Sequence, residues 1–360
     1  MTLRTIATLG ALALLSAAAA PALAARTYTL SGDHVTIWNP AGEVHLAPGT
    51  GNVVEVDVNA LGRDAAQLKV NDQPLDGQPT LRVLYPGDRI VYPRMGIWSN
   101  TATSVRSDGT WGKHDKGFNL IRRRLSIHGS GSGTEAWTDL VVRVPRGRNV
   151  VVYSLAGPCE IHNVDGNIGF DGGSGGVQVE KSRGALKLDI GSGAVEVAGF
   201  DGELDVDTGS GGVRVSDVHG TRVRLDTGSG SVTGERVTAD DLAVDTGSGS
   251  VDMAQVDTRR AKIDTGSGGV DLGLLSATAD LDIDTGSGHV RVTLPQNFSA
   301  RLHLETGSGG IHSDLPVTIE QKGTGLLRGT MGSGTGRLHV DTGSGGVTLL
   351  ASNTARPRSR

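Results

Sequence analysis

Cysteine is nearly absent from this sequence. Cys159 is the one cysteine in 360 residues, so the chain cannot form an intramolecular disulfide. Stability must then come from backbone hydrogen bonds and a packed core. We expect Cys159 to be a buried free thiol.

Aromatic residues are also scarce, at 3% of the chain, and they are unevenly distributed. All four tryptophans precede residue 140, whereas the aromatic residues after residue 160 are Phe170, Phe200 and Phe298. Glycine is abundant instead: 55 of 360 residues, about twice the usual share of ~7%. The shift in composition predicts two regions of different construction.

The sequence has no apolar run of the ~18 residues that a membrane-spanning helix needs, and no transmembrane segment is expected. Its N-terminus has the pattern of a secretory signal peptide instead: Arg4, an apolar run over 9–20, and the A-x-A site Ala22-Leu23-Ala24. We expect residues 1–24 to be removed and the mature chain to be exported, to the periplasm, the cell surface or the extracellular space. The net charge of −5 argues against nucleic acid as a partner.

The string VDTGSGG at residues 206–212 contains the D-T-G motif of aspartic proteases. It is one of six D-T-G-S-G copies, which begin at Asp207, Asp226, Asp245, Asp264, Asp284 and Asp341. A protease needs two such turns on separate lobes, with both carboxylates at one cleft. Five of the copies lie only 19 or 20 residues apart, which leaves no room for two lobes, so the motif is interpreted as a structural repeat.

Each repeat has the same layout. An apolar-x-apolar segment precedes the T-G-S-G turn, as in Leu204-Asp205-Val206, and another follows it, as in Val213-Arg214-Val215. Alternation of this kind predicts short strands with one buried face. One unit cannot bury its own apolar side chains, whereas stacked units can. The sequence therefore predicts an all-β fold: a β-solenoid, taken as a right-handed β-helix, with coils of 18–21 residues.

The predicted organisation has four parts: a signal peptide at 1–24, an irregular N-terminal β region or cap at 26–148, the solenoid at 149–350, and a disordered basic tail at 351–360. The repeat spacing breaks near the C-terminus, where residues 329–350 contain two G-S-G turns only 11 residues apart. This irregularity predicts a terminal hairpin that caps the stack.

These residues resemble a known family, the bacterial putative adhesins with β-strand repeats, a domain of unknown function. The resemblance rests on the repeated V-x-V-D-T-G-S-G-x-V unit, on V-P-R-G at 144–147, and on the ordered ending E-T-G-S-G-G-I, L-L-R-G-T-M-G-S-G and D-T-G-S-G-G-V-T-L. It implies an exported, non-catalytic β-repeat protein with adhesion or envelope-associated roles. It supplies no catalytic residues and no cofactor.

Two hypotheses remain open for the role of the repeated aspartates. An aspartate before a turn accepts backbone N–H bonds two residues further on. Alternatively, stacked carboxylates could hold calcium, as in a β-roll, although the β-roll repeat places its aspartate after the glycines. The weak calcium candidates are Asp207, Asp226, Asp245, Asp264 and Asp284. The threonines that follow form a second row, suited to strand ends or to an ordered ligand surface.

Catalysis is not expected. A polysaccharide-acting β-helix enzyme, the main alternative, would need clustered carboxylates at one depth along the rod, and the outward row is mixed in charge. The more specific binding residues are predicted in the N-terminal region: Trp98, Trp111, Arg122, Arg123 and Arg124. The expected partner is a cell-envelope or surface polymer, or another protein.

Overall fold

Strands form nearly all the regular structure in the described part of the chain. The computed structural model describes residues 25–112 and 122–352, so the predicted signal peptide and most of the basic tail lie outside the described residues. Two short 3-10 helices are present in the described part: η1 (Ala65–Gln67) and η2 (Pro93–Met95). No helix of that part is long and apolar enough to cross a membrane.

Thirteen strands lead into the regular repeat. They are β1 (Arg26–Leu30), β2 (His34–Ala41), β3 (Val44–Pro48), β4 (Val54–Leu61), β5 (Lys69–Asn71), β6 (Thr80–Leu84), β7 (Arg89–Val91), β8 (Asn100–Arg106), β9 (Arg122–His128), β10 (Trp137–Val144), β11 (Asn149–Ala156), β12 (Cys159–His162) and β13 (Asn167–Ser174). The remaining strands are β14 (Val177–Ser192), β15 (Val195–Thr208), β16 (Val213–Thr227), β17 (Val232–Thr246), β18 (Val251–Thr265), β19 (Val270–Leu274), β20 (Asp280–Thr285), β21 (Val290–Leu294), β22 (Ala300–Thr306), β23 (Ile311–Ser313), β24 (Thr318–Gly323), β25 (Leu326–Met331), β26 (Gly336–Thr342) and β27 (Val347–Ala351).

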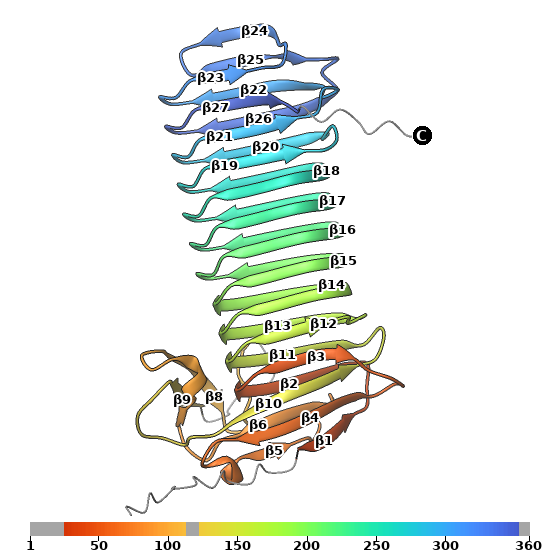
Figure 1. The fold of residues 1–360 in the computed structure, drawn as a ribbon, viewed down its shortest axis with the longest axis vertical. Helices are drawn as coiled ribbons and strands as arrows, with labels where there is room; N and C mark the ends of the chain where they lie inside the picture. Colours follow the sequence, from red (N-terminus) through yellow and green to blue (C-terminus); the bar gives the residue numbers. More distant parts are fainter. Residues whose placement is uncertain (1–24, 113–121, 353–360) are drawn as a thin grey trace, which may run out of the picture.

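The predicted β-solenoid is confirmed (Figure 1). From β14 to β18, each strand runs through a bend and contributes to two sides of the rod. Side A is the segment that follows a G-S-G turn, and side B is the segment that precedes the next one. Equivalent residues of successive coils pair in parallel register, as in Val195 with Val213 and Val213 with Val232.

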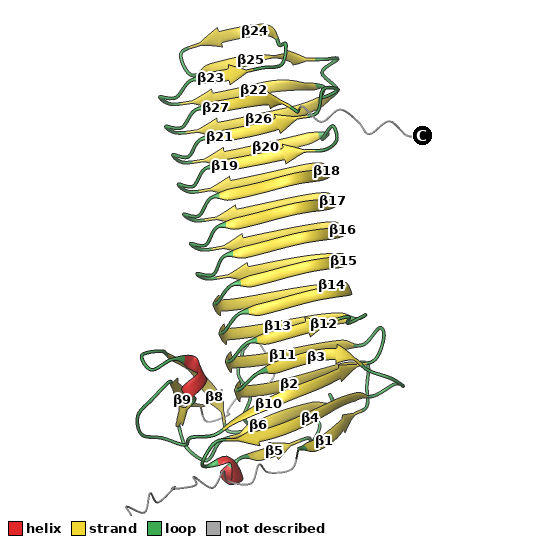
Figure 2. Ribbon diagram, in the orientation of Figure 1, coloured by secondary structure: helices red, strands yellow, loops and turns green. Residues whose placement is uncertain are grey.

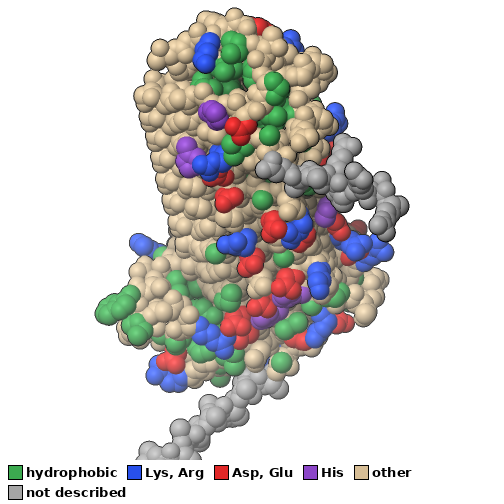
Figure 3. Space-filling model, turned by 45° about the horizontal axis from the view of Figure 1, so that its top comes forward, with side chains coloured by type: hydrophobic (Ala, Val, Ile, Leu, Met, Phe, Trp, Pro, Cys, Tyr) green, Lys and Arg blue, Asp and Glu red, His purple; other side chains and the backbone are tan. Residues whose placement is uncertain are grey.

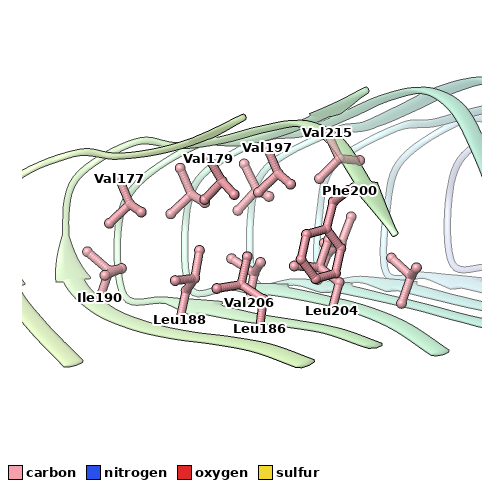
Figure 4. Close-up of a cluster of buried hydrophobic side chains, with 14 of the residues drawn as sticks. Val177, Val179, Leu186, Leu188, Ile190, Val197, Phe200, Leu204, Val206 and Val215 are labelled. Carbon is pink, nitrogen blue, oxygen red and sulfur yellow. The ribbon is translucent and has the colours of Figure 1, made fainter. Parts of the chain in front are cut away.

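The core lies between the two sides. Figure 4 shows Val177, Val179 and Val197 of side A facing Leu186, Leu188 and Ile190 of side B. These side chains are at most 3% exposed, and burial of each stabilises the fold by about 1.5–3 kcal/mol. Cys159 is buried in the same core, as expected, and its burial raises the pKa of the thiol.

Two kinds of bend close each coil. Figure 2 shows the G-S-G turns as a column of loops along one side of the stack. Their second glycine is required by close stacking, since a Cβ on Gly211 would lie 1.6 Å from the carbonyl oxygen of Gly193. The opposite bend contains a left-handed residue in each of several coils, including Lys181, Asp217 and Arg236, with φ between 49° and 55°.

The N-terminal strands are continuous with the solenoid. On side B, β2 lies between β6 and β11, and on side A, β3 lies between β10 and β12. The coil formed by β2 and β3 therefore lies between β10, which pairs with β3 on side A, and β11, which pairs with β2 on side B. Strands β10 and β11 follow each other in the chain. Antiparallel strands β4 and β1 continue side A beyond β10.

The C-terminal end differs from the prediction of a terminal hairpin. Strand β26 pairs with β20 on one edge and with β22 on the other, and β27 likewise lies between β21 and β23. The last G-S-G coil is thus an internal layer, and the hairpin β24–β25 ends the stack. The G-S-G spacing shows that a coil is present but does not specify which neighbours it pairs with.

A small three-stranded sheet projects from the N-terminal half of the rod (Figure 1). Strand β9 pairs in parallel with β7 and antiparallel with β8. We call this sheet and the η2 segment the lobe, residues 89–106 and 122–128. Its buried residues Ile90, Leu125 and Ile127 belong to the same hydrophobic cluster as the solenoid core, which fixes the lobe against the rod.

Candidate functional site

The threonine of each D-T-G-S-G copy points into the turn rather than toward solvent. The hydroxyl of Thr227 accepts a hydrogen bond from the N–H of Gly230 at 3.0 Å and donates one to the carbonyl of Gly211 at 2.8 Å. The same pair of bonds recurs at Thr208, Thr246, Thr265, Thr285, Thr306 and Thr342. These hydroxyls are buried, so the suggestion of a ligand-binding threonine surface is wrong.

The aspartates form an outward column on side B. Asp207, Asp226 and Asp245 pair in register between coils, and the column continues through Asp264 and Asp284. Within the described residues, these carboxylates accept no hydrogen bond from their own turns, and the one side-chain partner found is Arg224, which binds Asp226 at 2.7 Å. The predicted turn-holding role of Asp207 is therefore wrong, because the adjacent threonine performs it.

The stacked carboxylates of the aspartate column repel one another. Burial, followed by the charge of Asp207, raises the pKa of Asp226, and burial followed by the charge of Asp264 raises the pKa of Asp284. Like charges one coil apart disfavour the ionised form. No group of three His, Cys, Asp or Glu residues placed to hold a metal ion is found in residues 25–112 and 122–352.

A candidate binding site lies where the lobe meets the rod. A cleft of about 590 Å³ opens between the η2–β8 segment and the first G-S-G turns, a volume typical of small-molecule sites. It is lined by Glu43, Tyr92, Arg94, Met95, Trp98, Ser99, Asn100, Gly157, Pro158, Ser174, Gly175 and Ser192. We call it the Trp98 cleft, because the side chain of Trp98 is 93% exposed at its margin.

The loop that carries Trp98 is held by backbone contacts. Gly96 has φ of +93°. Its carbonyl lies so close to Gly129 that a Cβ on Gly129 would be 1.6 Å from the carbonyl oxygen. Gly129 donates its N–H to the carbonyl of Ser99 at 3.1 Å, and the hydroxyl of Ser130 donates to the carbonyl of Ile97 at 2.9 Å. The exposed indole thus sits on a constrained backbone.

The floor of the cleft is organised by Arg94. Its Nη1 donates to Glu43 at 2.7 Å and to Asp139 at 3.0 Å, and its guanidinium lies 5.6 Å from the ring centre of Trp137. Tyr92 packs against the same indole at 5.7 Å. Burial, followed by the charge of Asp139, raises the pKa of Tyr92 to about 12, so the phenol is neutral at physiological pH.

A family model, Toastrack DUF4097, matches residues 139–350, which is more than half of the chain. The protein belongs to the Toastrack DUF4097 family. A solved structure, a putative cell adhesion protein from Clostridium sporogenes, is similar over 91% of this chain and all of that chain, at 9% identity and a TM-score of 0.21. No curated protein matches the sequence.

The Toastrack match includes every G-S-G coil but begins after most of the residues that line the Trp98 cleft. Glu43, Arg94 and Trp98 come from the segments before residue 139, whereas Ser174 and Ser192 come from the matched region. The cleft is therefore a feature of how this chain joins its N-terminal strands to the Toastrack coils.

The other predicted binding residues are not at the cleft. Trp111 is 3% exposed, and its ring packs edge-on against Tyr153 at 6.5 Å. Arg123 donates to Asp88 and to the carbonyls of Gly87 and Tyr85, so it ties the lobe to the segment that precedes it. Arg122 and Arg124 are exposed on the same strand.

Sequence reasoning identified Trp98 but missed Glu43, Tyr92 and Arg94. Their signal was weak, because each lies in a different segment and only the lobe's fold brings them together. The one available clue was the concentration of tryptophan before residue 140.

Proposed function

We propose that this Toastrack protein is a non-catalytic, exported binding protein of the cell envelope. It would present the Trp98 cleft on a rigid rod to a surface polymer or to another protein. The observation that carries the proposal is the exposure of the Trp98 side chain, which is 93%. The loop that carries it is held by contacts with Gly129 and Ser130. An exposed indole at a cleft margin gains free energy when a ligand covers it, and tryptophan is enriched at binding hot spots.

The coil architecture supports a role in display. Each coil repeats the same core and turn, so the solenoid builds length around a continuous buried core. The D-T-G-S-G aspartates of side B lie one coil apart in a column rather than converging on one point. An enzyme acting on polysaccharide would bring an acid and a base or nucleophile to the two sides of one bond.

Co-sedimentation with a bacterial envelope fraction tests the proposal. The wild-type chain is expected to sediment with the envelope, and Trp98→Ala is expected to remain in the supernatant. Leu275→Ala is the matched control, because Leu275 is a large exposed apolar residue (54%) on a coil far along the rod. Equal sedimentation of the Trp98→Ala and wild-type proteins would contradict the assignment of the cleft.

Two further measurements address the rest of the proposal. N-terminal sequencing of protein from the extracytoplasmic fraction is expected to begin at Ala25. Incubation with acidic and neutral polysaccharides is expected to release no new reducing ends. Release that disappears on changing one or two carboxylates would establish the enzyme alternative.

A further inference from the structure

We propose that the Trp98 cleft binds an uncharged oligosaccharide, with the sugar stacked on Trp98 and the chain running along the rod. The inference rests on the proposed function and names its ligand class. A pyranose ring has an apolar C–H face that packs on an indole, and hydroxyls around its edge that need polar partners. The cleft provides both: one exposed indole, and polar groups on the remaining walls.

The charges of the cleft favour an uncharged ligand. Arg94 is the one cation among the lining residues and already binds Glu43 and Asp139. Two carboxylates around one guanidinium leave the floor with a net negative charge, so a phosphate or a uronate would be repelled. The remaining acceptor capacity of Glu43, whose side chain is 33% exposed, suits donation from sugar hydroxyls.

The wall opposite Trp98 repeats with the coils. Ser174 and Ser192 occupy equivalent positions in successive coils and pair in register, so their hydroxyls recur at the strand spacing of about 4.8 Å. That spacing is close to the length of one sugar unit in an extended chain. Gly157 and Gly175 at the same wall present backbone rather than side chains, which allows a flat ring to lie close. The geometry therefore orients the chain along the stack.

Tyr92 provides an independent indication of a polar ligand at this place. It is 1% exposed and lines the cleft. Its hydroxyl makes no hydrogen bond of normal geometry within the described residues, although Arg94 is near enough to act as a donor that lowers its pKa. A buried hydroxyl without a partner costs about 1–3 kcal/mol. A hydroxyl-bearing ligand that displaces the neighbouring side chains slightly would supply the missing bond.

Insertion into a lipid surface is the competing use of an exposed indole. Ile97, next to Trp98, is 67% exposed but does not line the cleft, and Figure 3 shows apolar side chains projecting at the left of the molecule, over the lobe. The acidic floor opposes anionic headgroups, and Trp98 borders a walled cleft, which a lipid surface would not need. The two uses therefore differ in what they require of Ile97.

Fluorescence titration of the full chain tests the inference. Trp38 and Trp111 are at most 3% exposed and Trp137 is half-buried, so acrylamide quenching reports mainly on Trp98. Cellotetraose and the tetramer of N-acetylglucosamine are the probes, with tetragalacturonate as the charged comparison. At least one neutral tetramer is expected to protect Trp98 from quenching in a saturable way, and more strongly than its dimer does.

The variants separate the outcomes. Trp98→Ala is expected to weaken neutral tetramer binding, measured by calorimetry, at least about tenfold, and Ile97→Ala to leave it unchanged. Both side chains are exposed, so neither variant should shift the thermal midpoint. Lack of protection by both neutral tetramers, or tighter binding of tetragalacturonate, would overturn the sugar assignment.

Failure of the inference is distinguishable from failure of the proposed function. If Trp98→Ala abolishes envelope sedimentation but no neutral sugar binds, the cleft has another ligand. If Ile97→Ala matches Trp98→Ala and the protein binds vesicles of phosphatidylethanolamine and phosphatidylglycerol, the site is a lipid contact. If Trp98→Ala sediments like the wild type, the proposed function itself is wrong.

Discussion

The hydroxyl of Thr246 donates a hydrogen bond to the carbonyl of Gly230, one coil away, at 2.9 Å. The same hydroxyl accepts the N–H of Gly249 in its own turn at 3.0 Å. One buried side chain thus joins each turn to the next coil. Because the arrangement recurs along the rod, it accounts for the threonine of the D-T-G-S-G repeat.

Thr246→Val should therefore destabilise the protein by about 1–3 kcal/mol, because it leaves a buried N–H and a buried carbonyl without their partner. Thr246→Ser keeps the hydroxyl and should cost less. Asp245→Asn is the matched control on the neighbouring residue and should have little effect. The measurement is the urea midpoint, and a larger loss for Asp245→Asn than for Thr246→Val would contradict the assignment.

Asp284→Asn should stabilise the protein at neutral pH. The folded-state pKa of Asp284 is raised by burial and by Asp264 and Asp341, so its ionised form is disfavoured in the fold. A raised pKa contributes stability below the unfolded-state value of 3.8, and that contribution is lost as pH rises through the folded-state pKa. The advantage of the variant should therefore be largest near pH 7 and fade toward pH 3. Thermal midpoints across this range measure it, and an advantage that grows on acidification would refute it.

Removal of calcium should leave stability unchanged. The D-T-G-S-G aspartates are one to a coil, and no convergent group of three ligands is present within the described residues, whereas calcium takes six to eight oxygens. The test is the thermal midpoint with added calcium and with excess EDTA. A higher midpoint in calcium that is lost in Asp245→Asn would restore the β-roll alternative.

Gly129→Ala should disorder the Trp98 loop while leaving the rod intact. The new Cβ would collide with the carbonyl of Gly96, and this contact fixes the loop backbone. Saccharides should then no longer protect Trp98 from acrylamide quenching. Far-ultraviolet circular dichroism, which is dominated by the solenoid, should not change. Gly310→Ala is a control of the same type, since a Cβ there meets no atom within 4 Å and the residue is not left-handed.

The fold was largely predictable because the solenoid is a local pattern repeated. Alternation at Leu204, Val206 and Val213 indicates the buried faces, and the spacing of the serines indicates the coil length; both are confirmed. Which strands pair with each other was harder to predict from the sequence. A strand such as β26 carries the same residues whether it ends the stack or lies within it, because every coil offers the same complementary edge.

The site was predictable only in part. Trp98 is conspicuous because tryptophan is rare in this chain, but composition alone does not separate it from Trp111, which is buried in the core. Arg123 shows the same difficulty, since a basic run predicts a charged surface while the fold uses its middle member to bind Asp88. The aspartates were misassigned because Asp and Thr both suit turns, and only the direction of the side chain decides between them.

The placement of β26 and β27 between earlier strands has a consequence for the order of synthesis. From β11 to β21, the coils can stack one after another as the chain emerges, since the layer beneath each strand has already been made. Strands β22 and β23 cannot dock in the same way, because the layer beneath them comes from residues 336–351. Strands β22–β25 are therefore synthesised before the layer on which they pack, and they can join the rod only after β26 and β27 have been synthesised. Chain growth from one end therefore builds most of the molecule, and its last layers close together in a single step.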